Sequence, residues 1–245
     1  MSTFIVVPRS FTVLANSAST TPTTYLQNDE PGLVWRTTGA SSNYVTVQLA
    51  AGSFNVISLA GTNLVAGDTI RIRLGNSQAS VEGSSAPVDR IATIASGTPQ
   101  NGSSFVIDKL NSPVTYTFAR IDFTSISGSY VEVSRLILGS AIVTDGIDVN
   151  AEFTFDNQTV NRLDPYHSKP TWKISLSGFK DAQFWNEWGD TLRSISKKIG
   201  FLFVPDLTNS YVQQQTIFGY ATAIPKGTLI ATDYTTVEIV VQSLL

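Results

Sequence analysis

Between residues 44 and 139 the sequence alternates apolar and polar residues in short runs, separated by clusters of Ser, Gly, Asn and Pro. The runs are YVTVQLA (44–50), FNVISLAG (54–61), TIRIRLG (69–75), RIATIAS (90–96), TYTFARIDFT (115–124) and YVEVSRLILG (130–139). A period of two is typical of a β-strand with one buried face and one solvent-exposed face. Because no helical spacing separates the runs, they predict an antiparallel β-sandwich.

The last hundred residues follow a different pattern, in which strand-like runs flank one helical segment. The strand-like runs include TWKISLSG (171–178), FLFVPD (201–206) and YTTVEIVVQSL (234–244). Between them, the apolar residues of the helical segment recur at helical spacing: Phe184, Trp185, Trp188, Leu192, Ile195 and Ile199. Asp181 suits the first turn of a helix and Gly200 its end. We therefore expect one amphipathic helix at about 181–199 on a small β-sheet or barrel, an α+β arrangement.

The charges also divide the chain. Residues 1–143 carry eight Lys and Arg residues against eight Asp and Glu residues, and seven of the eight basic residues are Arg. Residues 144–245 carry eight basic against eleven acidic residues, and six of the eight are Lys. This change in composition, with a turn-like TDGID segment near the join, predicts two domains, 1–143 and 144–245.

The composition narrows the class of partner. Charged residues make up 14% of the chain, against about 25% in an average globular domain, so Ser, Thr, Asn, Gln and Gly must cover much of the surface. A net charge of −3 is too small to indicate a nucleic-acid partner. The start, MSTFIVVPRSFTV, lacks a basic region of the secretory type. No stretch approaches the ~20 apolar residues of a membrane span, so we expect no membrane insertion.

The sequence offers little material for catalysis. It has no cysteine and one histidine, His167, in a polar segment that ends in proline. A Ser-His-Asp triad or a zinc site would depend on that one imidazole. Asp29 and Glu30, and likewise Asp145 and Asp148, are best interpreted as turn and cap residues. Closeness in sequence does not place two carboxylates across a cleft, and the turn that contains Asp145 and Asp148 lacks the ligand density of a calcium site. We predict no catalytic residue, no metal site, no cofactor and no enzymatic activity.

Trp35 and Arg36 form the most individual polar–aromatic pair in the chain. One interpretation is a ligand-binding site in which an aromatic ring stacks on a sugar or peptide beside a charged neighbour. The other is a core anchor, with Trp35 inserted between two sheets and its N–H bonded to backbone. The position just before an alternating strand favours the core anchor, with Arg36 and Trp35 kept as candidate binding residues.

The aromatic residues of the predicted helix raise a similar choice. At helical spacing, Phe184 and Trp188 are first of all the core face. Trp185 lies one step off that stripe and broadens it, so it could reach a partner protein. Trp185 and Trp188 are therefore candidate interface residues.

Several motifs in order resemble the galactose-binding-like, discoidin-type jelly roll. They are Trp35 after the first loop, the YVTVQLA strand, Leu59-Ala-Gly61 with Asn63, Phe118-Ala119-Arg120, and the ending Arg135-Leu136 with Gly139. The match covers roughly residues 20–140. The resemblance implies a β-sandwich for residues 1–143.

The combination of this sandwich with the second half resembles tail-tip and baseplate proteins of long-tailed bacteriophages and gene transfer agents. The segments that carry it are RLILGSAIVTDGIDVN, the Trp172 strand, the aromatic helix and GFLFVPD. The resemblance implies a non-enzymatic structural protein, made in the host bacterial cytoplasm and built into the virion tail. It also implies a homo-oligomeric ring, with the tail tube and hub as partners and residues 144–245 as the assembly domain.

The alternative function is a carbohydrate-binding module that attaches to a host-surface glycan. Lectin-type sandwiches carry aromatic and charged residues in loops at one end. The segments SQASVEGSSAPVDR (77–90) and SGTPQNGSS (96–104) contain no aromatic residue, which favours a scaffold over a sugar site. A glycoside hydrolase, which needs two carboxylates across a cleft, is a third and weaker hypothesis.

Overall fold

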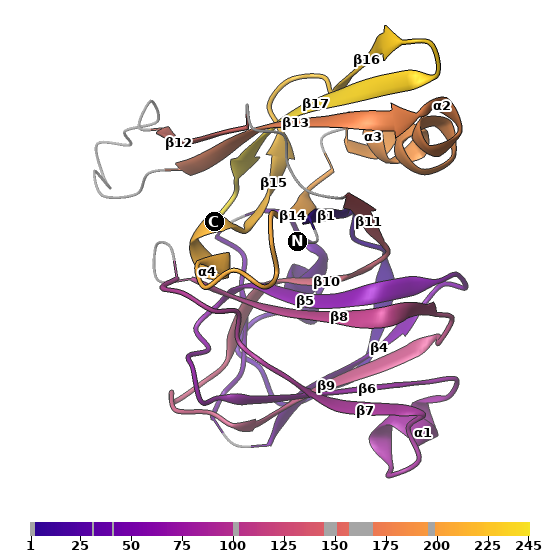
Figure 1. Cartoon of the computed structure of the whole chain (residues 1–245). Coiled ribbons are helices and arrows are strands. Elements are labelled where there is room, and N and C mark those ends of the chain that lie inside the picture. The colour runs from indigo at the N-terminus through magenta and orange to yellow at the C-terminus, as the bar shows by residue number, and fades with distance from the viewer. Residues whose placement is uncertain are drawn as a thin grey trace. The chain divides into compact units, whose positions relative to one another are not determined.

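A computed structural model describes residues 3–30, 32–40, 42–99, 103–144, 151–156, 169–195 and 199–245. His167, Asp145 and Asp148 lie outside the described residues. The chain divides into two compact units (Figure 1). Pro8–Ser140 form one, called here the sandwich unit, and Met1–Val7 with Ala141–Leu245 form the other, called the sheet unit.

The sheet unit includes the start of the chain, whereas the sequence predicts a single division into 1–143 and 144–245. Strand β1 (Thr3–Val6) pairs with β11 (Ala141–Thr144) on one side and with β14 (Phe201–Val204) on the other. Both pairings are antiparallel. Since these partners are distant in sequence, no local pattern assigns the first strand to the second unit.

The sandwich unit consists of two antiparallel sheets, which confirms the predicted fold class. The four-stranded sheet has the order β3-β10-β5-β8, and the five-stranded sheet has the order β2-β4-β9-β6-β7. The strands are β2 (Phe11–Asn16), β3 (Trp35–Arg36), β4 (Asn43–Leu49), β5 (Phe54–Thr62), β6 (Thr69–Gly75), β7 (Val88–Ala92), β8 (Ser104–Val114), β9 (Phe118–Ser125) and β10 (Glu132–Gly139). A 3₁₀ turn, η1 (Thr23–Gln27), and a short helix, α1 (Gln78–Glu82), lie in the connections.

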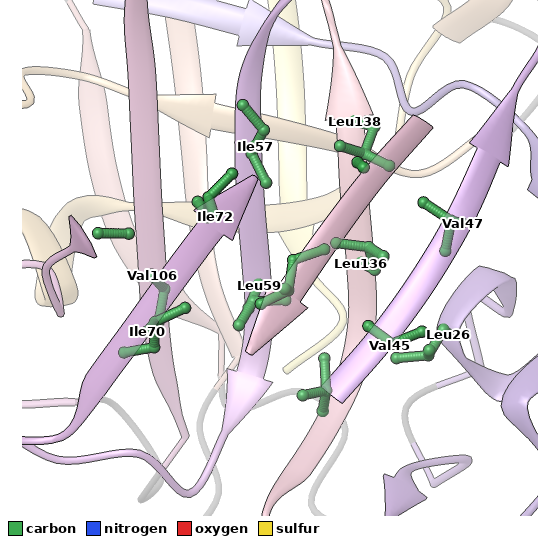
Figure 2. Packing of buried hydrophobic residues seen from close by; sticks show 14 of the residues in the cluster. Leu26, Val45, Val47, Ile57, Leu59, Ile70, Ile72, Val106, Leu136 and Leu138 are labelled. Atoms are coloured by element: carbon green, nitrogen blue, oxygen red, sulfur yellow. The ribbon is translucent and has the colours of Figure 1, made fainter. Parts of the chain in front are cut away.

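Residues two apart on facing strands build the core between these sheets. Figure 2 shows side chains from both sheets converging on one layer. The pairs are Val45 and Val47 on β4, Ile70 and Ile72 on β6, Ile57 and Leu59 on β5, and Leu136 and Leu138 on β10. Each such side chain contributes about 1.5–3 kcal/mol when it is fully buried. The apolar residues of the alternating runs therefore form the core between the two sheets.

The arginine of the RLILG motif holds a loop to this core. Arg135 Nε lies 3.0 Å from Asp29 Oδ1, and Arg135 Nη1 donates to the carbonyl of Leu26 at 3.1 Å. Both Arg135 and Leu26 are buried. This motif residue therefore fastens η1 and the turn after it, and Asp29 has a structural role.

The sheet unit has one long sheet with the order β11-β1-β14-β15-β17-β13-β12, and β16 pairs with β17 beside this path. Its remaining strands are β12 (Glu152–Asp156), β13 (Lys169–Lys180), β15 (Ile217–Ala221), β16 (Lys226–Ala231) and β17 (Tyr234–Ser243). A short helix, α4 (Val212–Gln215), precedes β15. This arrangement of one sheet with helical segments agrees with the predicted α+β class.

The predicted helix begins at Asp181 and is helical through Ile195, where the described part of this segment ends. It consists of α2 (Asp181–Gln183), a π-helical turn η2 (Phe184–Trp188) and α3 (Gly189–Ile195). Its buried residues pack on the sheet: Phe184, Trp188, Leu192 and Ile195. Trp185 and Ile199 do not join them and are exposed. No helix in the described ranges is long and apolar enough to cross a membrane.

Candidate functional site

Trp35 belongs to the sandwich core, so the interpretation of its ring as a ligand-binding platform is wrong. The side chain is fully buried, and its ring centroid lies 6.2 Å from that of Phe123. Its indole N–H finds no acceptor among the described residues, contrary to the expected backbone bond. The side chain points between the sheets because it lies on β3, at the position that pairs with Val133 of β10.

Arg36 is the next residue of β3, so its side chain points to the opposite face. Its guanidinium lies over the ring of Tyr130, with Cζ 4.6 Å from the ring centroid. Its Nε donates to Glu132 Oε1 at 2.6 Å. The hydrogen bond and the charge of Glu132 raise the pKa of Arg36 above its ordinary value. Of the two candidate residues, only Arg36 is available to a ligand.

Two loops around Arg36 are tied together by buried and half-buried polar groups. Asn63 Nδ2 donates to the carbonyl of Tyr130 at 2.9 Å, and Asn63 Oδ1 accepts from the Glu132 N–H at 2.8 Å. Asn63 follows β5, Tyr130 lies two residues before β10, and Glu132 is the first residue of β10. One amide side chain therefore fixes the backbone on both sides of Val131, which holds Tyr130 and Glu132 in place.

A second link uses Asp68, which precedes β6. Its Oδ1 accepts from the N–H and the hydroxyl of Ser127, at 2.8 and 2.6 Å, and its Oδ2 accepts from the Val65 N–H at 2.8 Å. Burial alone would raise the pKa of Asp68, but the hydrogen bonds from Ser127 and Val65 outweigh burial and lower it. Beside Asp68 is an open cavity of about 350 Å³, bounded also by Ala66, Gly67 and Ile126.

These residues define a loop-end site, made up of Arg36, Asn63, Asp68, Ser127, Tyr130 and Glu132. It combines an aromatic ring, a guanidinium and a carboxylate on a rigid backbone. Its one hydroxyl beside a carboxylate is Ser127, which donates to Asp68, and the lowered pKa of Asp68 makes that carboxylate a weak base. The described residues include no cluster of His, Cys, Asp and Glu suited to a metal. The chemistry available here is recognition by hydrogen bonds and stacking.

The sequence pattern does not single out Tyr130 and Glu132, because they form the polar positions of the YVEV run and resemble the exposed residues of any strand. Their alternation with Val131 and Val133 is a usable signal, since it places both side chains on the exposed face. Their meeting with Arg36 depends on the pairing of β3 with β10, which the sequence does not reveal. The loop 77–90, considered for its lack of aromatic residues, contains α1 and follows the opposite end of β6.

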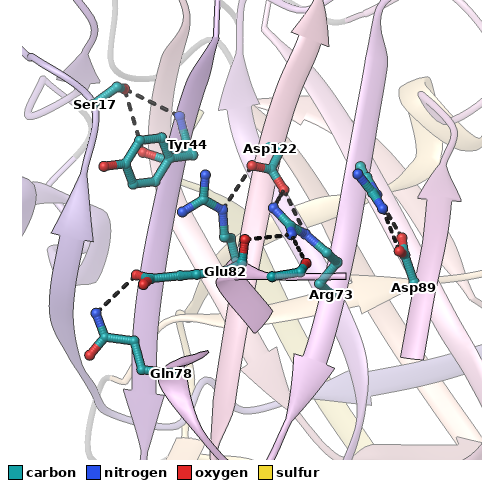
Figure 3. Close-up of polar contacts among 10 residues, drawn as sticks. Ser17, Tyr44, Arg73, Gln78, Glu82, Asp89 and Asp122 are labelled. Atoms are coloured by element: carbon teal, nitrogen blue, oxygen red, sulfur yellow. Dashed lines mark hydrogen bonds and ion pairs between the residues drawn. The ribbon is translucent and has the colours of Figure 1, made fainter. Parts of the chain in front are cut away.

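The outer face of the five-stranded sheet carries a separate polar network (Figure 3). Arg73 pairs with Asp122 at 2.7 Å, and Asp122 also binds Arg120, which lies over the ring of Tyr44 at 3.8 Å. Arg73 also donates to the carbonyls of Glu82 and Gly83. These side chains bind one another and the end of α1, so the network has a structural role.

The sheet unit contains a second candidate site, the Trp185 pocket, of about 480 Å³. It is lined by Asp181, Phe184, Trp185, Gly189, Leu192, Arg193, Gly227, Leu229 and Thr235. Trp185 is 64% exposed and Leu229 is 66% exposed. Trp188, in contrast, is fully buried and packs on Phe179 with ring centroids 5.1 Å apart. Trp188 is therefore a core residue, and Trp185 is the candidate interface residue whose ring is accessible.

Comparison with known proteins yields similarities of fold. No protein-family model matches the sequence, and no curated protein matches it. Among solved structures, CBM32-1 of a family 31 glycoside hydrolase from Clostridium perfringens has a TM-score of 0.41 at 10% identity, over 55% of this chain and 96% of that chain. The family 32 module of NanJ from C. perfringens, in complex with galactose, has a TM-score of 0.38 at 15% identity, over 56% and 98%.

The similar structures differ in what they bind. XRCC1 bound to the catalytic domain of DNA polymerase β has a TM-score of 0.41 at 13% identity, over 55% of this chain and 98% of that chain. At such identities and TM-scores, none of these matches identifies a ligand of this chain.

Proposed function

We propose that the chain is a non-enzymatic binding protein whose sandwich unit recognises carbohydrate at the loop-end site. The observation that carries the proposal is the arrangement of Arg36, Tyr130 and Glu132. Sugar hydroxyls need several donors and acceptors in fixed positions, and the apolar face of a sugar ring needs an aromatic surface. The two loops that Asn63 and Asp68 tie down would hold these groups in place before a ligand arrives, which limits the entropy lost on binding.

The groups at this site retain hydrogen-bonding capacity. Arg36 uses Nε and Nη2 toward Glu132, so the donors of Nη1 have no partner in the described part of the chain. The guanidinium covers part of the Tyr130 ring, so a sugar would contact the ring at its free edge and hydroxyl. Because Arg36 and Glu132 neutralise each other, the proposal favours neutral glycans over strongly acidic ones.

A glycan array probed with the full chain, followed by calorimetry on the best ligand, tests this proposal. We expect Arg36→Ala and Tyr130→Ala each to weaken binding roughly tenfold or more. Arg71→Ala is the matched control, because Arg71 is also a half-exposed arginine in a surface ion pair, with Asp89, on another face. The proposal fails if the array gives no ligand, or if binding survives both substitutions in variants with unchanged circular dichroism.

A second candidate function is the structural role in a bacteriophage tail tip or baseplate, as a ring that contacts the tail tube and hub. The observation that favours it is the exposure of Trp185 and Leu229 around one pocket of the sheet unit. Clustered exposed apolar side chains with a polar rim are typical of protein–protein interfaces. This role and glycan recognition are compatible, because they use different units.

Mass photometry of the purified chain tests the second candidate. We expect a closed oligomer, and we expect the chain in purified virion tails, with Trp185→Ala weakening its incorporation there. A monomer at high protein concentration, together with absence from virions, would rule this function out.

A further inference from the structure

Strand β16 forms an open edge of the sheet unit. On one side it pairs with β17, from Lys226 opposite Glu238 to Ala231 opposite Tyr234. No other strand in the described ranges pairs with β16. Figure 1 shows the β16–β17 hairpin at the border of this unit. The outer edge of β16 therefore presents backbone N–H and C=O groups that another extended chain could pair with.

The Trp185 pocket lies over one face of the β16–β17 hairpin, where Gly227 and Leu229 of β16 and Thr235 of β17 line it. One wall comes from the helical stretch, through Trp185 and Leu192, and the other comes from Leu229 of β16, while Phe184 and Gly227 form the floor. The start of the helix is fixed to the hairpin tip, because the Asp181 N–H donates to the Asp233 carbonyl at 3.1 Å. Edge strand and helix thus enclose a groove between them.

Gly227 shapes the floor of the groove. A Cβ atom at this position would lie 2.7 Å from Phe184 Cζ, so a residue with a side chain would push the ring away. The Phe184 ring therefore lies against the backbone of β16. The Trp185 ring stands edge-on to it, with centroids 5.0 Å apart and an interplanar angle of 82°.

The π-helical turn separates the roles of the two adjacent aromatic residues. Phe184 is buried and forms the floor, whereas Trp185 is exposed and forms a wall. Short π-helical turns inside α-helices occur frequently at functional sites. An exposed Trp beside an exposed Leu leaves apolar surface that a partner side chain can cover.

We propose that this groove binds an extended peptide segment of a partner protein, which adds to the outer edge of β16. The backbone of the segment pairs with β16, and one of its apolar side chains lies between Phe184, Trp185 and Leu229. Recognition by strand addition combines main-chain hydrogen bonds with a pocket for alternate side chains. The rim residues Asp181 and Arg193 carry opposite charges, so a segment with little net charge fits best.

The free backbone edge decides the class of occupant. The backbone N–H and C=O groups of a helix are already bonded within the helix, and a lipid has no donors and acceptors spaced like those of a β-strand. Neither would therefore pair with the edge of β16. A second copy of this chain is the other possible source of an extended segment, because its own edge strands are open on one side, and the competition experiment below distinguishes it from a partner protein. The source of the segment, a partner protein of the assembly, rests on the proposed assembly role. The mode of binding rests on the groove alone.

A displayed library of linear peptides of about nine residues, near the upper length of a typical strand, provides the probe. Selection is carried out on the full chain, with counter-selection on a Trp185→Ser, Leu229→Ser double variant. Both side chains are largely exposed, so these variants should fold. We expect enriched peptides that alternate apolar and polar residues. Their synthetic versions should bind roughly tenfold more weakly to Trp185→Ala and to Leu229→Ser.

Two controls separate strand addition from simple apolar contact. Ile224→Ala removes an apolar side chain that is 78% exposed and lies outside the groove, and it should leave peptide affinity unchanged. Two versions of the peptide are N-methylated, one at the odd-numbered amides and one at the even-numbered amides. Only the version whose methyl groups replace the N–H groups that face β16 should lose binding. Equal binding by both N-methylated peptides would overturn the proposal, as would the absence of any peptide enriched over the double variant.

Peptide binding and ring formation have separate readouts. An intact ring that binds no peptide would overturn the strand-addition proposal and leave the assembly role standing. A monomer that binds the peptides would support the groove and count against the ring. Self-association that Trp185→Ala abolishes, and that no peptide competes with, would assign the groove to a second copy and overturn the proposal.

Discussion

Arg73 and Asp122 form a buried ion pair across two strands of the sandwich, with Nη2 and Oδ2 2.7 Å apart. The side chains are 7% and 10% exposed. Arg73 also donates to the Gly83 carbonyl at 2.7 Å, and Asp122 accepts from Arg120 Nε at 2.8 Å. The pair therefore links β6, β9 and the end of α1, and neither charge is left without a partner (Figure 3).

Asp122→Ala should destabilise the sandwich unit by about 3–5 kcal/mol, because it leaves the buried guanidinium of Arg73 without its carboxylate. Asp89→Ala is the matched control. It breaks the neighbouring pair with Arg71, whose side chains are 39% and 33% exposed, and it should cost about 0–1 kcal/mol. Urea unfolding of the full chain, followed by tyrosine and tryptophan fluorescence, measures both. If both variants lost the same free energy of unfolding, burial would not be what makes the Arg73–Asp122 pair more important for stability than the Arg71–Asp89 pair.

Trp35→Ala should destabilise the chain by about 3–5 kcal/mol, because it opens a cavity between the two sheets. Arg36→Ala, one residue along the chain, should cost much less, since it removes a surface ion pair with Glu132 and a surface contact with the Tyr130 ring. Thermal unfolding compares the two. If Trp35→Ala does not fold, Trp35→Phe should still fold with a lower midpoint. An Arg36→Ala loss as large as that of the tryptophan would contradict the core and surface assignments.

Gly219→Ala should be among the most damaging small substitutions in the sheet unit. A Cβ atom there would lie 1.9 Å from the Gln242 carbonyl oxygen, and a backbone atom cannot move aside as a side chain can. We expect a loss of about 3 kcal/mol or more. Gly39→Ala is the control, because no atom lies within 4 Å of its Cβ position. Differential scanning calorimetry should show a lower transition for Gly219→Ala only.

Arg90 and Asp108 predict a pH-dependent stability. Burial raises the pKa of Asp108 above its ordinary 3.8, and the charge of Arg90 opposes that rise. Arg90 Nη2 lies 2.9 Å from Asp108 Oδ1, and Asp108 Oδ2 has no hydrogen-bond partner in the described ranges. A raised folded-state pKa means that the stabilisation from this group is complete below the unfolded pKa and is lost as the pH rises through the folded pKa.

Arg90→Ala should raise the pKa of Asp108 further, so that ionisation of this carboxyl costs more folding free energy. The variant should lose about 1–2 kcal/mol relative to the native chain near pH 7. The difference should shrink as the pH falls through the folded-state pKa of Asp108, because the carboxyl is then protonated in both proteins. Arg90→Lys, which keeps the charge, should behave more like the native chain. Denaturant unfolding across this pH range measures the effect, and a pH-independent difference would refute it.

Helices and strands that form from patterns of neighbouring residues can be predicted from this sequence. Period-two alternation in runs such as TIRIRL and YVTVQL fixed the strands and the residues of the sandwich core, because successive side chains of a strand point to opposite faces. Helical spacing likewise identified the stretch that starts at Asp181. It also suggested that Trp185 could face outward while Trp188 is buried, although it could not separate the two as interface candidates.

Contacts between segments that are distant in sequence depend on strand pairing and cannot be predicted from local patterns. Arg36 reaches Glu132, 96 residues away, because β3 pairs with β10, and this contact turns an ordinary strand start into a candidate site. In the same way, β1 joins the sheet of the last hundred residues by pairing with β11 and β14. The ring of Phe184, on the helical segment, lies against Gly227 of β16. A buried face requires apolar residues at alternate positions of one strand, so a few neighbouring residues reveal it. Strand pairing is different, because a strand could pair with several other edges of similar composition. That choice depends on the packing of the whole unit.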